Sequence, residues 1–153
     1  MAGHDIETPA GKLLKKQLGE LEKLQVRVGY QHGAETGEDG GADLADVAMW
    51  NELGTAHMPA RPFLRQSVDG NASRISAACK AQLQAVASGK ATAEGALAAL
   101  GAMQKGLVQH TIQGGGFKPN APATVKRKGS DRPLIDTGRM RQSVTFAIVP
   151  KGG

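Results

Sequence analysis

Hydrophobic residues recur every three or four positions in three long segments of the chain, which is the spacing of one helix face. The first segment covers residues 8–24 and starts with a Thr–Pro pair, a capping residue followed by proline at the first helical position. The second covers 62–87, with Gly70 as a weak point, and the third covers 92–113. The connection over 88–92 is short, so the second and third helices are expected to be antiparallel neighbours.

Two short segments alternate between apolar and polar residues, which is typical of strands. They are VRVGY at 26–30 and VTFAIV at 144–149. Between them, Asp43 can cap a short helix over 44–53, and Gly54 can end it with a left-handed backbone. The expected fold class is α+β, with a small β-sheet packed against the two long antiparallel helices.

Glycine is abundant and aromatic residues are few, with 21 glycines and an aromatic content of 3%. Segments 31–42 and 114–132 contain few apolar residues, so they are expected to be flexible Gly-rich loops. Residues 1–153 are expected to form a single domain whose ordered core covers about 8–149. With so few large side chains, the chain is expected to need neighbouring copies for part of its burial.

The stretch NELGTAHMPARPFL ends one predicted helix, crosses two prolines and begins another. Each proline fixes its own φ angle and disfavours helix in the residue before it, so the segment should be extended and stiff. Phe63 lies here between Arg61 and Arg65, and all three are candidates for an interface. Two interpretations are open: a purely structural corner, or a surface that contacts a partner.

Charge is unevenly distributed along the chain. Residues 1–60 carry five basic and ten acidic residues, net −5, whereas residues 61–153 carry fourteen basic and four acidic residues, net +10. The basic part could meet nucleic acid, or the acidic part of one copy could meet the basic part of the next in a head-to-tail ring. The later basic residues that could take part in an interface are Lys126, Arg127, Lys128, Arg132, Arg139 and Arg141.

No catalytic or metal-binding motif stands out. The four histidines lack metal-ligand spacing and no nucleophile–base pair is visible, so neither enzymatic activity nor a cofactor is expected. Cys79 is the only cysteine; it is expected to lie in the core and fits a reducing cytosol. Glu52 and Asp136 are expected to cap helices or form loop salt bridges. The chain has no run of about 18 apolar residues, so no membrane span is expected.

Two motif-like stretches resemble one known family. NELGTAHMPARPFLRQSV, followed by an alanine-rich helical pair and then KRKGSDRPLIDTGRMRQSVTF, resembles the head–tail joining or neck proteins of long-tailed bacteriophages and prophages, also called tail-completion or virion-morphogenesis proteins. The resemblance covers roughly residues 25–149. The matching positions are Asn51, Glu52, Leu53, Gly54, Thr55, Pro59 to Arg65, Pro133 to Gly138, Met140 and Ser143.

The resemblance implies a non-enzymatic structural protein of the virion. Such proteins form a ring between the portal-side connector and the tail, and DNA passes through the ring. The implied partners are further copies of the chain, phage connector and tail proteins, and DNA in the lumen. The implied location is the bacterial host cytoplasm during assembly and then the neck or tail of the virion.

Within this implied role, Pro59 and Pro62 stiffen the corner, and Phe63 anchors it in the core. Arg61 and Arg65 are then expected to face a neighbouring copy.

In the second stretch, Asp136 or Thr137 is expected to cap a turn of helix, and Gly138 permits the turn. Arg139 and Arg141 are the interface candidates there.

Other functions stay open at this point. Within the same class, the chain could be a tail-tube terminator or a minor tail protein. From other classes, it could be a basic nucleic-acid-binding module or a small hydrolase, although the sequence offers no convergent polar groups for the latter. Two features depart from the family pattern: the acidic, Gly-rich segment 31–42 and the short distance between the last predicted strand and the end of the sequence.

Overall fold

The computed structural model describes residues 7–34, 42–114 and 138–152. Most of the two expected flexible loops therefore lies outside the described residues. The same holds for the candidate residues Lys126, Arg127, Lys128, Arg132, Asp136 and Thr137, and for the matching positions 133–135.

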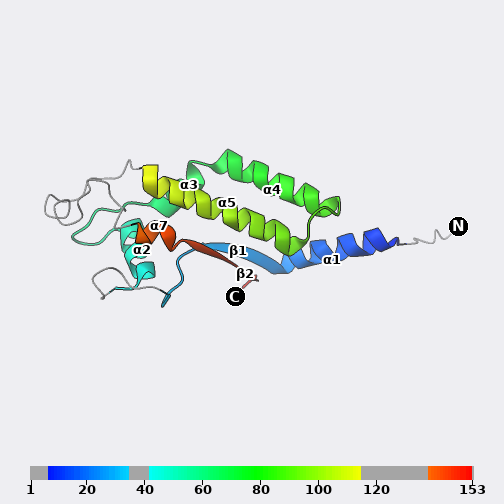
Figure 1. The fold of residues 1–153 in the computed structure, drawn as a ribbon, viewed down its shortest axis with the longest axis horizontal. Coiled ribbons are helices and arrows are strands. Elements are labelled where there is room, and N and C mark those ends of the chain that lie inside the picture. Colours follow the sequence, from blue (N-terminus) through cyan, green and yellow to red (C-terminus); the bar gives the residue numbers. More distant parts are fainter. Residues whose placement is uncertain (1–6, 35–41, 115–137, 153) are drawn as a thin grey trace.

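The described part of the chain contains six helices and two strands. In chain order they are α1 (Pro9–Lys23), β1 (Leu24–Gly29), α2 (Leu44–Leu53), α3 (Phe63–Asp69), α4 (Ala72–Ala87), α5 (Ala93–Gly114), α7 (Arg139–Gln142) and β2 (Thr145–Pro150). Figure 1 shows an elongated body with α1 at one end and α2 and α7 at the other. The predicted α+β fold class is confirmed.

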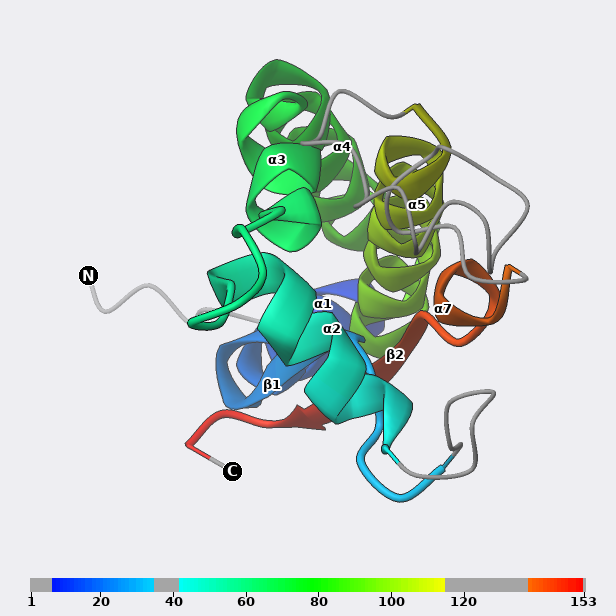
Figure 2. The same ribbon diagram turned by 90° about the vertical axis from the view of Figure 1, so that its left-hand side faces the viewer.

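The sheet is a single antiparallel pair of strands. β1 and β2 pair along their whole length, starting with Leu24 opposite Pro150. α5 packs against both strands and α4 packs against α5 (Figures 1 and 2). The close approach of α5 depends on Gly101, because a Cβ there would lie 2.5 Å from the Cδ2 of Phe146. Both predicted strands are thus present, and α5 is the long helix that covers them.

Three predicted helix starts are confirmed by their capping bonds. The Oγ1 of Thr8 accepts a backbone N–H three residues further on at 3.1 Å, and Pro9 opens α1. Asp43 caps α2 in the same way through its Oδ1 at 2.8 Å. Thr92 caps α5 through its Oγ1 at 3.0 Å. Each bond satisfies a backbone donor that the first turn of a helix leaves without a partner.

The single helix predicted over 62–87 is wrong: the segment forms two helices, α3 and α4, with Gly70 and Asn71 between them. In a continuous helix the carbonyl of Ser67 would accept the backbone N–H of Asn71. Instead the side-chain Nδ2 of Asn71 donates to that carbonyl at 2.9 Å, and its backbone N–H turns to Val68 at 3.1 Å. Gly70 weakens the helix, and the side chain of Asn71 takes the place of a backbone donor at the Ser67 carbonyl. Together they explain the break between α3 and α4.

The main core lies where α2, α3, α5, α7 and the residue before β2 meet. Its residues are Ala48, Phe63, Val108, Ile112, Met140 and Val144. Phe63 is completely buried, which confirms its predicted role as the anchor of the corner. The expectation that Phe63 itself takes part in an interface is wrong, because the core of one copy encloses its ring.

The apolar face of α3 and α4 is only partly covered. Val86 is buried, but Val68 is 47% exposed and Leu83 is 53% exposed. Cys79 is exposed as well, so the expectation of a core cysteine is wrong. Helical spacing identifies an apolar face, but it does not show whether another element covers that face.

A candidate subunit interface

The corner between α2 and α3 is held by a side chain from the preceding helix. The two carboxylate oxygens of Glu52 accept the backbone N–H groups of Leu64 at 2.8 Å and Arg65 at 3.1 Å. These amides belong to the first turn of α3, where N–H groups lack partners inside the helix. Pro62 is at the N-cap position and makes no side-chain capping bond, so Glu52 takes that role. The helix-capping role predicted for Glu52 is confirmed.

Gly54 sets the direction in which the chain leaves α2. Its φ is +77°, and a Cβ at this position would lie 2.8 Å from the backbone nitrogen of Ala60. The chain then reverses through a short bridge in which the N–H of Thr55 donates to the carbonyl of Met58 at 2.9 Å. Residues 59–62 have no regular secondary structure, in agreement with the expected stiff, non-helical segment. A side chain at position 54 would therefore disturb both the turn and the returning chain.

Arg61 is enclosed by the corner instead of facing outward. It is 6% exposed, and burial lowers the pKa of its guanidinium. Its backbone N–H donates to the carbonyl of Asn51 at 2.6 Å, and Asn51 is itself buried with its Nδ2 bonded to the carbonyl of Val47 at 2.8 Å. The expectation that Arg61 faces a neighbouring copy is wrong, because the chain folds back onto the end of α2. Arg65 is exposed, so its interface role stays a prediction.

The two motif stretches meet in the core. The rings of Phe63 and Tyr30 pack edge to face, with centroids 6.2 Å apart and an interplanar angle of 76°. The hydroxyl of Tyr30 donates to the carbonyl of Met140 at 2.7 Å, and burial raises the pKa of Tyr30. Met140 belongs to the second stretch and is also buried. Both stretches therefore have a packing role within one copy.

In the second stretch, Gly138 adopts a left-handed backbone, in agreement with the expectation that it permits a turn. Its φ is 77° and its ψ is 0°, directly before α7. Arg139 and Arg141 follow in α7 and are half-buried. The Nε2 of Gln109 donates a hydrogen bond to the carbonyl of Arg141 at 3.1 Å, which connects α5 to α7. The interface role of these two arginines stays a prediction.

α2 exposes three large apolar side chains in its C-terminal half. Met49 is 49% exposed, Trp50 is 41% exposed and Leu53 is 67% exposed. They lie within an arc of about 100° on the helix, since successive residues are about 100° apart. The opposite side of α2 is buried through Leu44, Ala48 and Asn51. We call Met49, Trp50 and Leu53 the α2 patch.

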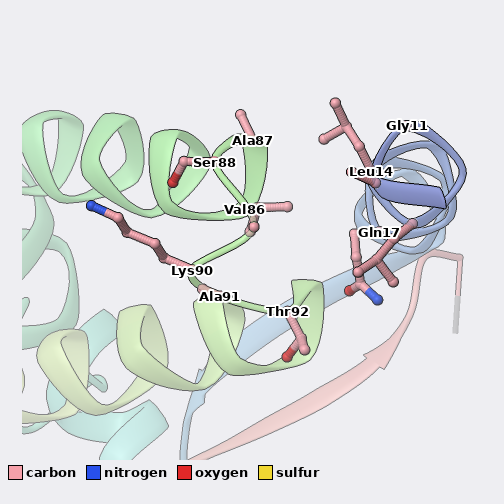
Figure 3. A pocket seen from close by; sticks show the side chains of 12 residues that line it. Gly11, Leu14, Gln17, Val86, Ala87, Ser88, Lys90, Ala91 and Thr92 are labelled. Atoms are coloured by element: carbon pink, nitrogen blue, oxygen red, sulfur yellow. The ribbon is translucent and has the colours of Figure 1, made fainter. Parts of the chain in front are cut away.

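A hollow of about 370 Å³ lies at the other end of the molecule, between α1 and the link that joins α4 to α5. In Figure 3, Leu14 and Gln17 of α1 face Val86 across this space. The Oε1 of Gln17 accepts the backbone N–H of Ala93 at 2.7 Å, which ties α1 to the start of α5. Leu13 also lines the hollow and is 53% exposed. We call this space the α1 hollow.

A second hollow of about 390 Å³ lies between β1 and the helices α3, α4 and α5. Val68 and Cys79 are part of its largely apolar lining. Its polar members, Ser67 and Gln104, are bonded to each other, with the Nε2 of Gln104 donating to the Oγ of Ser67 at 2.9 Å. We call it the central hollow.

Two further properties concern only the part of the chain that the structure describes. No group of three histidine, cysteine, aspartate or glutamate side chains is placed there to hold a metal ion. None of the helices in that part is long and apolar enough to cross a membrane.

Comparisons of the chain with protein-family models, with curated proteins and with solved structures found no match. The resemblance to head–tail joining proteins therefore stays a hypothesis that rests on the two motif stretches. The sequence singled out the corner residues, but it did not single out the α2 patch or the α1 hollow. The one available signal was the arc formed by Met49, Trp50 and Leu53 on a short helix.

Proposed function

We propose that this protein is a non-enzymatic structural subunit of a tailed bacteriophage or prophage, and that it forms part of the head–tail connection as a ring through which DNA passes. The observation that carries the proposal is the amount of large apolar side chain left uncovered in a single copy. The residues concerned, each at least 37% exposed, are Leu13, Leu18, Met49, Trp50, Leu53, Val68 and Leu83.

The grouping of these side chains supports self-association. Single exposed hydrophobic residues are ordinary on a soluble protein, whereas contiguous ones are typical of interfaces. Three of the seven form the α2 patch, and Leu13 lines the α1 hollow. Fully burying one such side chain stabilises an association by roughly 1.5–3 kcal/mol. Contact between copies would therefore cover surfaces that a single copy leaves in water.

The two motif stretches support the kind of assembly. Their resemblance to head–tail joining proteins favours a ring that contacts the phage connector and tail proteins, made in the host cytoplasm and then built into the virion. The charge is compatible with this role: residues 118–141 carry seven basic and two acidic residues, and a basic lumen would attract the phosphate backbone of DNA.

In this assembly the corner has a supporting role. The Glu52 cap and the Gly54 turn fix α2 relative to α3, so the α2 patch is held in one orientation before any contact forms. A surface that is already ordered loses less conformational entropy on binding. The corner would thus act on the interface through the position of α2.

The test is deletion of the gene from the phage or prophage that carries it, with cryo-EM of the particles and the wild-type gene supplied in trans as the control. We expect filled heads and unjoined tails without the protein, and a ring of labelled protein at the head–tail joint when it is restored. Labelled protein at the end of tails that have not met a head would identify a tail-tube terminator instead. Normal joining in its absence would overturn the proposal.

A further inference from the structure

The helix α2, which carries the α2 patch, and the helix α1, which lines the α1 hollow, lie at opposite ends of the elongated body (Figure 1). The patch is convex, because Met49, Trp50 and Leu53 project from one side of a helix and remain exposed. The hollow is concave and is lined largely by apolar groups, including Leu13, Leu14 and Val86 (Figure 3). Within one copy these two surfaces do not meet, so each is open to contact with another molecule.

The two surfaces fit each other in size. A cavity of about 150 Å³ is large enough to hold a benzene ring. The α1 hollow measures about 370 Å³, so an indole together with a neighbouring aliphatic side chain can enter it. Trp50 and Leu53, which are three residues apart on α2, are such a pair.

The charges around the two surfaces are also complementary. α2 carries Asp46 and Glu52 and has no basic residue. Among the described residues that line the α1 hollow, Lys90 is the one charged residue, and it is exposed. A patch-to-patch contact between two copies would bring the acidic α2 helices together, which is unfavourable, whereas patch-to-hollow contact joins opposite charges.

We propose that the α2 patch of one copy docks in the α1 hollow of a second copy of this chain. Because each copy carries one patch and one hollow at opposite ends, the contact is head-to-tail and can be repeated around a ring. This inference deepens the proposed function, since it names the surface on which that ring would be built. The three patch residues form the centre of a contact that needs about 800 Å² per partner to be stable.

The fluorescence of Trp50 can report the contact directly, because Trp50 is the only tryptophan in the chain. Its emission should move to shorter wavelength as purified protein is concentrated from about 1 μM to about 1 mM, a range that covers weak to moderate affinities. Sedimentation velocity over the same range should show larger species. A wild-type chain that stays monomeric with unchanged emission throughout would overturn the inference.

Two variants test the pairing of surfaces. Leu53→Asp disables the patch and Leu13→Asp disables the hollow; the two leucines are 67% and 53% exposed, so both variants should fold. Each alone should weaken association by about tenfold or more, since a charge replaces a buried leucine. Mixed in equal amounts, they should form a dimer and nothing larger, because one intact patch then meets one intact hollow. Circular dichroism checks that both variants are folded.

Val68→Asp is the matched control, because Val68 is 47% exposed but lines the central hollow. It should associate as the wild type does. If Val68→Asp lost association and the other two variants kept it, the contact would lie at the central hollow and the inference would be overturned. Failure of the mixed variants to pair would also overturn it. The solution experiments test the docking of patch and hollow without any phage particle. If the protein associated through the patch but were not built into virions, only the proposed function would be contradicted.

Discussion

The Oε2 of Glu52 lies 2.8 Å from the backbone nitrogen of Leu64 and accepts its N–H, so the end of α2 caps the start of α3. Replacing Glu52 with alanine should lower the free energy of unfolding by about 1 kcal/mol, the usual cost of losing a helix cap. Glu52→Gln keeps a neutral acceptor and should lose less. Urea unfolding of the three proteins measures this, and equal stability of Glu52→Ala and wild type would contradict the capping role.

The sequence predicted helix starts well because the capping signal is local. Thr8 and Asp43 stand directly before the helices that they cap, so neither depends on the rest of the fold. The burial of Arg61 could not be predicted in this way, since it arises only when the chain folds back onto α2. The exposure of Cys79 was missed for a related reason: its helical spacing indicated a core face, but no element in the described part of the chain covers it fully.

The candidate interface was only partly predictable. The chain's shortage of large side chains indicated a need for neighbouring copies, and the structure adds where the uncovered surface lies. Trp50 belongs to α2 and Val86 lines the α1 hollow, and the two residues are 36 positions apart in the sequence, so no local pattern relates them. The proposed contact joins Trp50 of one copy to the hollow lined by Val86 of another copy, and a contact between copies leaves no motif in the sequence.

Gly54 should tolerate substitution less well than Gly89. Both have a positive φ, +77° and +75°, so alanine is strained at either position. A Cβ at position 89 meets only open space, whereas at position 54 it would press on the backbone of Ala60 at 2.8 Å. We expect Gly89→Ala to cost about 1 kcal/mol of unfolding free energy and Gly54→Ala to cost clearly more. Thermal unfolding of both variants is the measurement, and an equal cost would show that the turn can relax.

Gly101 and Gly106 on α5 should respond to alanine in opposite directions. A Cβ at Gly101 would lie 2.5 Å from the ring of Phe146 and 2.9 Å from the Cγ2 of Val26, so Gly101→Ala should destabilise by about 1–3 kcal/mol through overpacking. Gly106 has nothing within 4 Å, and Gly106→Ala should stabilise by about 0.5–1 kcal/mol through helix propensity. Denaturant unfolding separates the two effects. Stabilisation by Gly101→Ala would mean that α5 does not pack closely on the sheet.

Asp43 should make the stability of the fold depend on pH. The backbone N–H groups of Ala45 and Gly33 and the nearby imidazole of His32 lower the pKa of its carboxyl. The pKa of the Asp43 carboxyl is lower in the folded protein than in the unfolded chain. Its ionised form therefore stabilises the fold above the ordinary carboxyl pKa of about 3.9, and this stabilisation is lost as pH falls through the folded pKa. Asp43→Asn keeps an acceptor for the cap and removes the titration. The difference in unfolding free energy between wild type and this variant should therefore shrink between pH 7 and pH 2, and a difference that stays constant would exclude the linkage.

Arg61 and Arg65 stand four residues apart in the corner and should behave differently. Arg61 is 6% exposed, so Arg61→Glu would place a carboxylate in a space that now encloses a guanidinium and an aliphatic stem. A buried charge that is left without compensation commonly costs about 3–5 kcal/mol, which is a large part of the roughly 5–15 kcal/mol that stabilises an ordinary domain. Arg65 is exposed, and Arg65→Glu should change the free energy of unfolding by no more than about 0.5 kcal/mol.

The comparison of these two variants decides what the corner contributes to assembly. Of the two glutamate variants, urea unfolding should show a lower free energy of unfolding only in Arg61→Glu. Arg61→Lys should be more stable than Arg61→Glu, because lysine keeps the positive charge and the apolar stem. Arg65→Glu should remain folded, so any loss of particle assembly in that variant reports a contact with a partner. If Arg61→Glu were as stable as wild type, the guanidinium would not be held by the corner, and an outward role for Arg61 would again be open.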